Sequence, residues 1–148
     1  MKRIIRGGVG PALGALLATL SAGGAAYGQA TGSAPVSTHV GSYESTVSGQ
    51  PLTLPQGPAQ VTVSRTLIPP GGSIPPHRHP YPRYNYVLDG GVRVTNLDTG
   101  SVQEFRAGQF IVETVGQWHS GEALDGRSAE LLAIDQTPPG RSNMERRP

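Results

Sequence analysis

The sequence predicts an all-β domain built from short antiparallel strands, and both its composition and its turn spacing support this. The 148 residues include 21 glycines and 14 prolines, and only 15% are charged. Glycine and proline break helices, so the composition argues against a helical bundle. Between these breakers lie short runs rich in Val, Thr, Leu and Tyr, which are typical of strands. A spacing of about 8–12 residues between turns favours a sandwich, jelly roll or small barrel.

The predicted strands follow one another from residue 60 onwards with little sequence between them. The run 61–67, VTVSRTL, alternates apolar with small polar residues, which indicates a half-buried strand. Asp89-Gly90 is a strong signal for a tight turn between the next two strands. The other predicted strands are 83–88, 92–97, 101–106, 109–114, 118–124 and 129–134.

The first 30 residues have the pattern of a secretory signal peptide. Three basic residues among the first six precede an apolar stretch from Val9 to Leu20, and small residues then lead to Ala30. The apolar stretch is shorter than the roughly 20 residues that a membrane span needs. We therefore expect a Sec-type signal over 1–30, a periplasmic or secreted protein, and no membrane contact after cleavage.

The rest of the chain divides into a flexible leader (31–57), a folded domain (58–136) and a disordered tail (137–148). The leader and the tail are polar, which favours coil. Residues 31–148 contain nine arginines, no lysine and ten acidic residues, so they lack the basic surface expected of a nucleic-acid-binding protein. The chain has no cysteine, which excludes a disulfide scaffold, a thiolate metal site and a cysteine nucleophile.

Three histidines form a candidate metal site. Residues i and i+2 of an extended chain project to the same side, so His77 and His79 present two imidazoles to one point. His119 follows a predicted turn, and a third imidazole from a neighbouring strand would complete a set around one ion. Neutral imidazole suits Zn, Cu, Fe and Ni. The alternative is that the His-Arg-His sequence is a polar surface feature without a ligand.

Around these histidines the chain resembles the cupin family. Seven of the ten defined positions in the two cupin motifs are matched, by Gly71, His77, His79, Gly90, Gly108, Gly116 and His119. The resemblance spans about Val61–Ile134. It implies a single antiparallel jelly-roll or cupin β-barrel with a metal inside, and a homodimer as a common assembly.

The main departure from the family pattern is Arg83, which stands where the first motif has a glutamate ligand. A guanidinium cannot bind a metal because it stays protonated and has no free lone pair. An inward-pointing Arg83 would add positive charge that an anion must offset, and we expect it to hold an anionic small-molecule substrate. Two alternatives stay open. Arg83 pairs with Glu113 or Glu122 in a degenerate site, or Glu113 replaces the missing carboxylate.

Two more residues are candidates for substrate contact. Asn85 shares the predicted inward face with Arg83, and Gln117 lies two residues before His119. The sequence singles out no residue as the catalytic group.

These features predict an exported small-molecule cupin with a three-His divalent metal site, and a dioxygenase-type oxidoreductase is the activity we favour. Three protein ligands leave coordination positions for substrate and O₂, by analogy with oxygenases that use two histidines and a carboxylate. We expect Zn or Cu in the isolated protein, because affinity rises toward the later first-row ions, with Fe, Ni and Mn as other candidates. The alternatives are a non-catalytic metal- or ligand-binding module and a metal-assisted lyase or isomerase.

Overall fold

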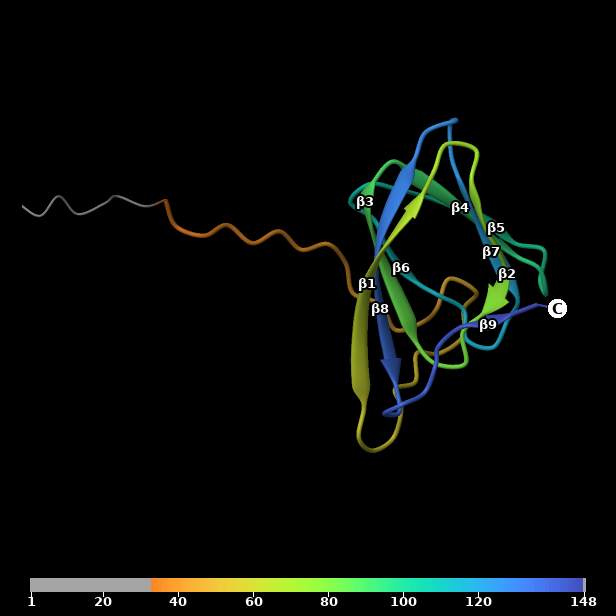
Figure 1. Cartoon of the computed structure of the whole chain (residues 1–148). Coiled ribbons are helices and arrows are strands. Elements are labelled where there is room, and N and C mark those ends of the chain that lie inside the picture. Colours follow the sequence, from red (N-terminus) through yellow and green to blue (C-terminus); the bar gives the residue numbers. More distant parts are fainter. Residues whose placement is uncertain (1–32, 148) are drawn as a thin grey trace, which may run out of the picture. The chain divides into compact units, whose positions relative to one another are not determined.

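The computed structural model describes residues 33–147, in which every regular element is a β-strand (Figure 1). The predicted signal peptide lies outside the described residues. Within them, no helix has the length and apolar character needed to cross a membrane. The strands are β1 (Gln60–Ile68), β2 (Ser73–Arg78), β3 (Arg83–Asp89), β4 (Gly91–Asn96), β5 (Val102–Arg106), β6 (Phe110–Val112), β7 (His119–Ala123), β8 (Ala129–Thr137) and β9 (Glu145–Arg146).

The strands form two antiparallel sheets that face each other, as Figure 1 shows. One sheet has the order β1-β8-β3-β6 and the other has the order β5-β4-β7-β2-β9. Between them, the inward-facing apolar side chains make a core of Ile68, Val87, Val92, Val94, Ile111, Ala129 and Leu131. The predicted all-β jelly-roll class is confirmed.

The hairpin between β3 and β4 turns at Asp89-Gly90, as the sequence predicts. Gly90 has φ +69, and a Cβ at this position would lie 2.1 Å from the backbone oxygen of Ser128. Only glycine avoids both the strained φ and this clash. The turn therefore fixes the register of β3, the strand that carries Arg83 and Asn85.

The prediction for β1 is right about the strand, but most of the strand is more exposed than the predicted half-burial. Val61, Val63 and Leu67 are 57%, 58% and 67% exposed, and Thr62 and Ser64 on the other face are exposed as well. Only Thr66, which lines a cavity between the sheets, and Ile68 are half-buried or buried. Alternation reveals that the two faces differ, but the sheet's other strands decide which face lies inside.

Strand β2 was not predicted, because Pro75 and Pro76 interrupt its sequence. Proline cannot donate a backbone hydrogen bond, so it is tolerated in a sheet mainly at edges and irregular positions. The pairing of β2 with β7 shows such an irregularity: the register shifts between Ile74 and His77. This shift comes just before His77 and His79, which lie on either side of Arg78 at the end of the strand.

The prediction of a disordered tail over 137–148 is wrong for its described residues. Strand β8 continues to Thr137, and β9 pairs with β2. Between them, Asn143 is 6% exposed. Composition alone predicts coil here, but pairing with β2 orders this polar segment. We call residues 138–147 the C-terminal strap.

The leader predicted to be flexible over 31–57 is likewise not flexible throughout. Thr46 is buried, and the backbone N–H of Val47 donates to the carbonyl of Val112 at 2.8 Å. The side chain of Gln50 donates to the carbonyl of Val115 and accepts from its N–H, at 2.8 and 2.9 Å. Contacts to the sheet and the following loop, rather than strand pairing, hold this short segment.

Candidate metal centre

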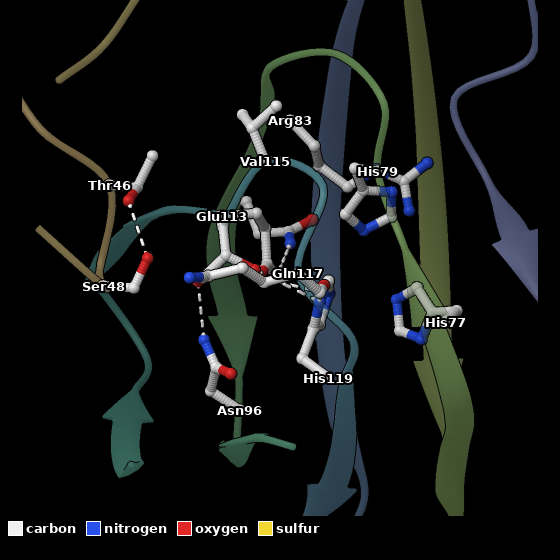
Figure 2. A network of polar contacts seen from close by, with 12 residues as sticks. Thr46, Ser48, His77, His79, Arg83, Asn96, Glu113, Val115, Gln117 and His119 are labelled. Carbon is white, nitrogen blue, oxygen red and sulfur yellow. Dashed lines mark hydrogen bonds and ion pairs between the residues drawn. The ribbon is translucent and has the colours of Figure 1, made fainter. Parts of the chain in front are cut away.

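The structure brings the three predicted histidines together in the interior. His77 is the last but one residue of β2, His79 directly follows the end of the strand, and His119 begins the adjacent strand β7 opposite His77. Their nearest ring nitrogens all lie within 4.8 Å of one another, and their exposed fractions are 5%, 0% and 1%. Figure 2 shows the three rings gathered at one point, with Glu113 nearby. The alternative of a surface His-Arg-His sequence is excluded.

A backbone carbonyl accepts a hydrogen bond from the Nδ1 atom of each of the three rings. The Nδ1 atoms of His77, His79 and His119 lie 2.8, 2.6 and 3.0 Å from the carbonyl oxygens of Pro75, Asn143 and Gln117. A carbonyl oxygen only accepts, so each Nδ1 carries the proton and each Nε2 keeps its lone pair. In metal sites this arrangement fixes the tautomer and the orientation of histidine ligands.

The pKa values of two of the rings favour the neutral, ligand-competent form. Burial, followed by the neighbouring His119, lowers the pKa of His77 to about 4. Burial, followed by the nearby Arg83 cation, lowers the pKa of His79 to about 2. Both rings are therefore uncharged near neutral pH, where protons do not compete with a metal ion for them.

Glu113 brings a carboxylate to the same site. It follows β6 and is 6% exposed. Its Oε1 atom accepts a 2.7 Å hydrogen bond from Asn85, and its Oε2 atom lies 3.6 Å from His119 Nε2. Among the described residues, Oε2 has no hydrogen-bond partner, and neither do Nε2 of His79 or Nε2 of His119. Buried polar atoms are normally satisfied, so these three orphaned atoms fit a metal ion bound between them.

The histidines and Glu113 line one end of a cavity between the two sheets. The free volume of this cavity is about 30 Å³. Its wall also includes the apolar residues Val92, Ile111 and Leu131. Convergent polar groups around a space of this size suit an ion and a bound water.

Arg83 also lines this cavity, but its charge is already paired within the chain. Its Nε and Nη2 atoms donate to Oδ1 and Oδ2 of Asp135, on β8, at 2.7 and 2.6 Å. The predicted alternative of a pair with Glu113 or Glu122 is wrong, because Asn85 holds Glu113 and Arg93 pairs with Glu122. A bidentate pair satisfies both ions, which is how a cation is tolerated this close to a metal site.

Sequence comparison agrees with this geometry. A family model described as "Cupin domain" matches residues 64–135. These residues form a cupin domain. The match includes the histidines and Glu113, and it places Arg83 inside the domain, at the position where the sequence departs from the first cupin motif. No curated protein matches the chain.

Solved structures resemble the cupin domain at low sequence identity. A formate complex of oxalate decarboxylase from Lactobacillus farciminis is 20% identical, over 58% of this chain and 26% of that chain, with a TM-score of 0.50. The polyketide cyclase RemF from Streptomyces resistomycificus is 26% identical, over 62% of this chain and 66% of that chain, with a TM-score of 0.49.

A recombinant oxalate oxidase bound to glycolate is 26% identical, over 58% of this chain and 45% of that chain, with a TM-score of 0.49. The chain spans less than half the length of three oxalate oxidase structures that it matches, at 41%, 44% and 45%. The likeness therefore concerns the cupin fold.

The two predicted substrate contacts have different outcomes. Asn85 lines the cavity, but its amide is committed to Glu113. Gln117 is not among the residues that line the cavity, contrary to the prediction. Its side chain accepts a 2.8 Å hydrogen bond from Asn96, and its carbonyl orients His119. Gln117 therefore supports a cupin histidine from behind.

Sequence patterns missed two residues that organise the site. Asp135 lies 52 positions from its partner Arg83 in an apolar strand, and no local signal connects them. Asn143 lies in the strap, where its carbonyl holds His79 and its amide donates to Asp135 at 2.6 Å. Only the inward position of Asp135 on β8, in register with Arg83, would have indicated a pair.

Proposed function

We propose that this cupin binds one divalent transition metal ion through His77, His79 and His119, with Glu113 as a fourth ligand. One observation supports this above all. The free Nε2 atoms of two rings and the free Oε2 atom of Glu113 are buried in one cavity without partners. Glu113 thus replaces the carboxylate that Arg83 displaces from the first cupin motif, and it reduces the excess positive charge of a three-His site.

The donor set decides which ions are candidates. Three neutral imidazoles favour later first-row ions, with Zn or Cu expected in isolated protein. A carboxylate is a harder ligand and extends the range to Fe and Mn, and Ni also suits imidazole. Geometry and metal supply, rather than affinity alone, then determine which of these ions supports activity.

For the activity, we propose a dioxygenase-type oxidation of a small anionic molecule. A bound ion of this class would supply open coordination positions for the substrate and for O₂. The chain's own part is to hold the ligands rigidly and to surround the substrate with the apolar wall.

Arg83 supports an anionic substrate even though it is paired. The contacts with Asp135 use Nε and Nη2, so Nη1 lies outside the ion pair. A guanidinium has five N–H donors, and one face of the fork can hold Asp135 while the other donates to a substrate carboxylate. Arg83 then orients the anion without carrying an unbalanced charge into the cavity.

Metal reconstitution with oxygen uptake tests the proposal. Metal-free protein is loaded separately with Mn, Fe, Co, Ni, Cu and Zn, and stoichiometry is measured by mass spectrometry. Each form is then assayed for O₂ consumption with small carboxylates and matched neutral amides. We expect one ion per chain and metal-dependent uptake with carboxylates. Metal binding without turnover of any substrate would favour the non-catalytic binding module, and turnover without O₂ would favour a lyase or isomerase.

The proposed location is outside the cytoplasm, in the periplasm or the medium. The basic, apolar and small-residue order of residues 1–30 supports export. Intact-mass measurement of protein recovered from the exported fraction tests this. A mature N-terminus near Thr31 is expected, and a full-length mass in that fraction would contradict cleavage.

The proposed partner, besides a small anion, is a second copy of the chain. Strand β1 is at the edge of its sheet, is nine residues long, and has no proline, lysine or bulge that would block pairing. Its outward face carries the exposed side chains of Val61, Val63 and Leu67, together with Arg65, which pairs with Glu130 on β8. Two β1 strands related by a two-fold axis pair antiparallel with identical surfaces, which is the commonest closed assembly.

A further inference from the structure

The inner face of β8 changes from apolar to polar along the strand. Its inward residues are Ala129, Leu131, Ala133, Asp135 and Thr137, and all five are buried. The first two belong to the hydrophobic core. The last two follow the core residues toward the strap, beyond the wall of the metal cavity. The interior of this sheet therefore has an apolar end and a polar end.

The neighbouring strands change in the same direction. On β1, the buried Ile68 is replaced further along by Ser64 and Thr62, which are exposed and line a second cavity. The register places Thr62 and Arg83 on either side of Asp135, as its direct partners. Three strands thus bring polar side chains to one end of the sheet, where the core gives way to solvent.

These residues and the strap enclose a second cavity, which we call the outer cleft. It is lined by Thr62 and Ser64 on β1, by Arg83, Asp135 and Thr137, and by the strap residues 141–144. It is open to solvent and has a volume of about 370 Å³. Arg83 lines both the outer cleft and the metal cavity. The Arg83–Asp135 pair is therefore the boundary between them.

The unpartnered hydroxyl of Thr137 is the feature that points to a ligand. Its side chain lines the outer cleft and the residue is only 2% exposed, yet Oγ1 has no hydrogen-bond partner among the described residues. A buried hydroxyl without a partner destabilises a fold. A valine would have the same shape without that cost, so the hydroxyl is better explained by a bound partner than by packing.

The charges around the outer cleft favour an anion. Arg141 lines it, and its side chain is not buried. The one carboxylate in the wall, Asp135, is already occupied, because Arg83 donates to both of its oxygens and Asn143 to Oδ1. The groups left to contact a ligand are hydroxyls and guanidinium N–H donors. Hydroxyls and guanidinium forks are good partners for a carboxylate.

We propose that the outer cleft is a binding site for a small carboxylate, held by Arg141 and by the hydroxyls of Thr137, Ser64 and Thr62. The site lies across the Arg83–Asp135 pair from the metal cavity. It rests on the proposed function in one respect, that the carboxylate bound there belongs to the substrate of the metal site.

Calorimetric titration of the full, metal-free protein with malonate tests the site. We expect binding without any metal, and no binding of the neutral malonamide. Thr137→Val should weaken malonate binding about two- to tenfold, which is the range for one lost hydrogen bond. The same variant should unfold at a higher temperature, because it removes an unpartnered buried hydroxyl. A merely structural role for Thr137 would not produce this opposite pair of changes.

Matched variants complete the test. Arg141→Gln and Ser64→Ala should each weaken malonate binding, whereas Arg127→Gln and Thr95→Val make the same kinds of change elsewhere and should not. The inference is overturned if malonate does not bind, if Thr137→Val and Arg141→Gln bind it as tightly as the native chain, or if binding requires metal. Metal content is measured on separate reconstituted samples, so a chain that binds malonate but no metal contradicts the proposed function alone.

Discussion

Individual residues hold the metal centre through contacts made behind the ligands. The carbonyls that orient the three rings come from Pro75, Asn143 and Gln117. These residues lie within β2, in the strap and before β7. Each carbonyl fixes one tautomer, so the lone pairs converge before any ion arrives. Such preorganisation reduces the ordering that binding must otherwise impose.

The role of Glu113 is tested by Glu113→Gln. The amide can still accept the hydrogen bond from Asn85 through its oxygen, but it no longer provides an anionic ligand. We expect metal affinity to fall at least 10- to 100-fold, because changes outside the first coordination sphere alone have effects of about this size. Competition with a chelator measures the loss.

The control for this substitution is Glu122→Gln. Glu122 has an exposed side chain on β7 and pairs with Arg93 outside the cavity. It should leave metal affinity within about twofold of native, as expected for an exposed pair. Equal affinities for the native chain and the Glu113 variant would mean that three histidines form the whole ligand set.

The buried histidines also predict how stability depends on pH. The folded-state pKa values of His77 and His79, about 4 and about 2, lie below the ordinary value of 6.5. Below about pH 6.5 the unfolded chain takes up protons that the folded chain does not, so stability falls as the pH is lowered. The loss extends to about pH 4 for His77 and further for His79, at roughly 1 kcal/mol per pH unit for each ring.

Denaturant unfolding of the metal-free protein between pH 7.5 and 4.5 measures this slope. His77→Gln should make the decline shallower, and His39→Gln, which removes an exposed histidine in the leader, should not change it. A native chain that is equally stable across the range would show that the folded site takes up protons as readily as the unfolded chain.

The sequence predicts the ligands well because their signal is local. His77 and His79 share one side of an extended segment, and the cupin motifs place His119 just after a turn. The same local logic fails for Arg83, because its partner Asp135 is on another strand and only the register between β3 and β8 joins them. The sequence leaves Glu113 as one of several alternatives for the missing carboxylate. Only the folded structure shows that its Oε2 atom lies 3.6 Å from His119 Nε2.

Among the elements, the C-terminal strap links the polar tail to the metal centre. Its Asn143 carbonyl lies 2.6 Å from His79 Nδ1, and its Arg146 pairs with His77 across β9 and β2. The polar composition of 137–148 predicted coil because it contains few residues able to form a core. The segment is ordered instead by backbone pairing and by hydrogen bonds to buried groups, which composition does not reveal.

Removal of the strap tests this link between element and site. Truncation after Thr137 keeps β1 to β8 and removes the carbonyl behind His79. We expect the chain to keep its β-rich circular dichroism spectrum and to lose metal affinity by about 10- to 100-fold, as for other losses of groups that orient a ligand. Affinity is measured by chelator competition.

Glu145→Gln is the matched change within the strap. It weakens the exposed Arg78–Glu145 pair at 2.6 Å and leaves Asn143 in place. Its metal affinity should stay within about twofold of native, since an exposed ion pair contributes little. Native metal affinity in the truncated chain would show that His79 is oriented without the strap.

At the scale of the whole molecule, the two faces of the edge strand β1 have different surroundings. Its alternation predicted a half-buried strand, but residues 60–65 are exposed on both faces, and burial begins only at Thr66 and Ile68. Thr62, Ser64 and Thr66 on one face line the two cavities. Val61, Val63 and Leu67 on the other face are exposed at the edge of the sheet. An unprotected edge of this length is prone to pair with another strand.

Self-association through β1 is therefore the last prediction, and Val63→Arg tests it. Val63 is 58% exposed and pairs with Ile134 on β8, so the longer side chain meets only solvent in a single copy. In a two-fold pair of β1 strands, two introduced arginines approach each other across the axis, and like charges facing each other across strands are destabilising. Analytical ultracentrifugation should show a dimer for the native chain and a monomer for the variant.

The control is Val102→Arg, which introduces the same charge at an exposed position on β5, the edge strand of the other sheet. This variant should remain a dimer. If the native chain sediments as a monomer at concentrations up to about 100 µM, corresponding to an association weaker than roughly −5.5 kcal/mol, the exposed face of β1 does not bind a second copy. If both variants dissociate, the interface involves the edges of both sheets rather than β1 alone.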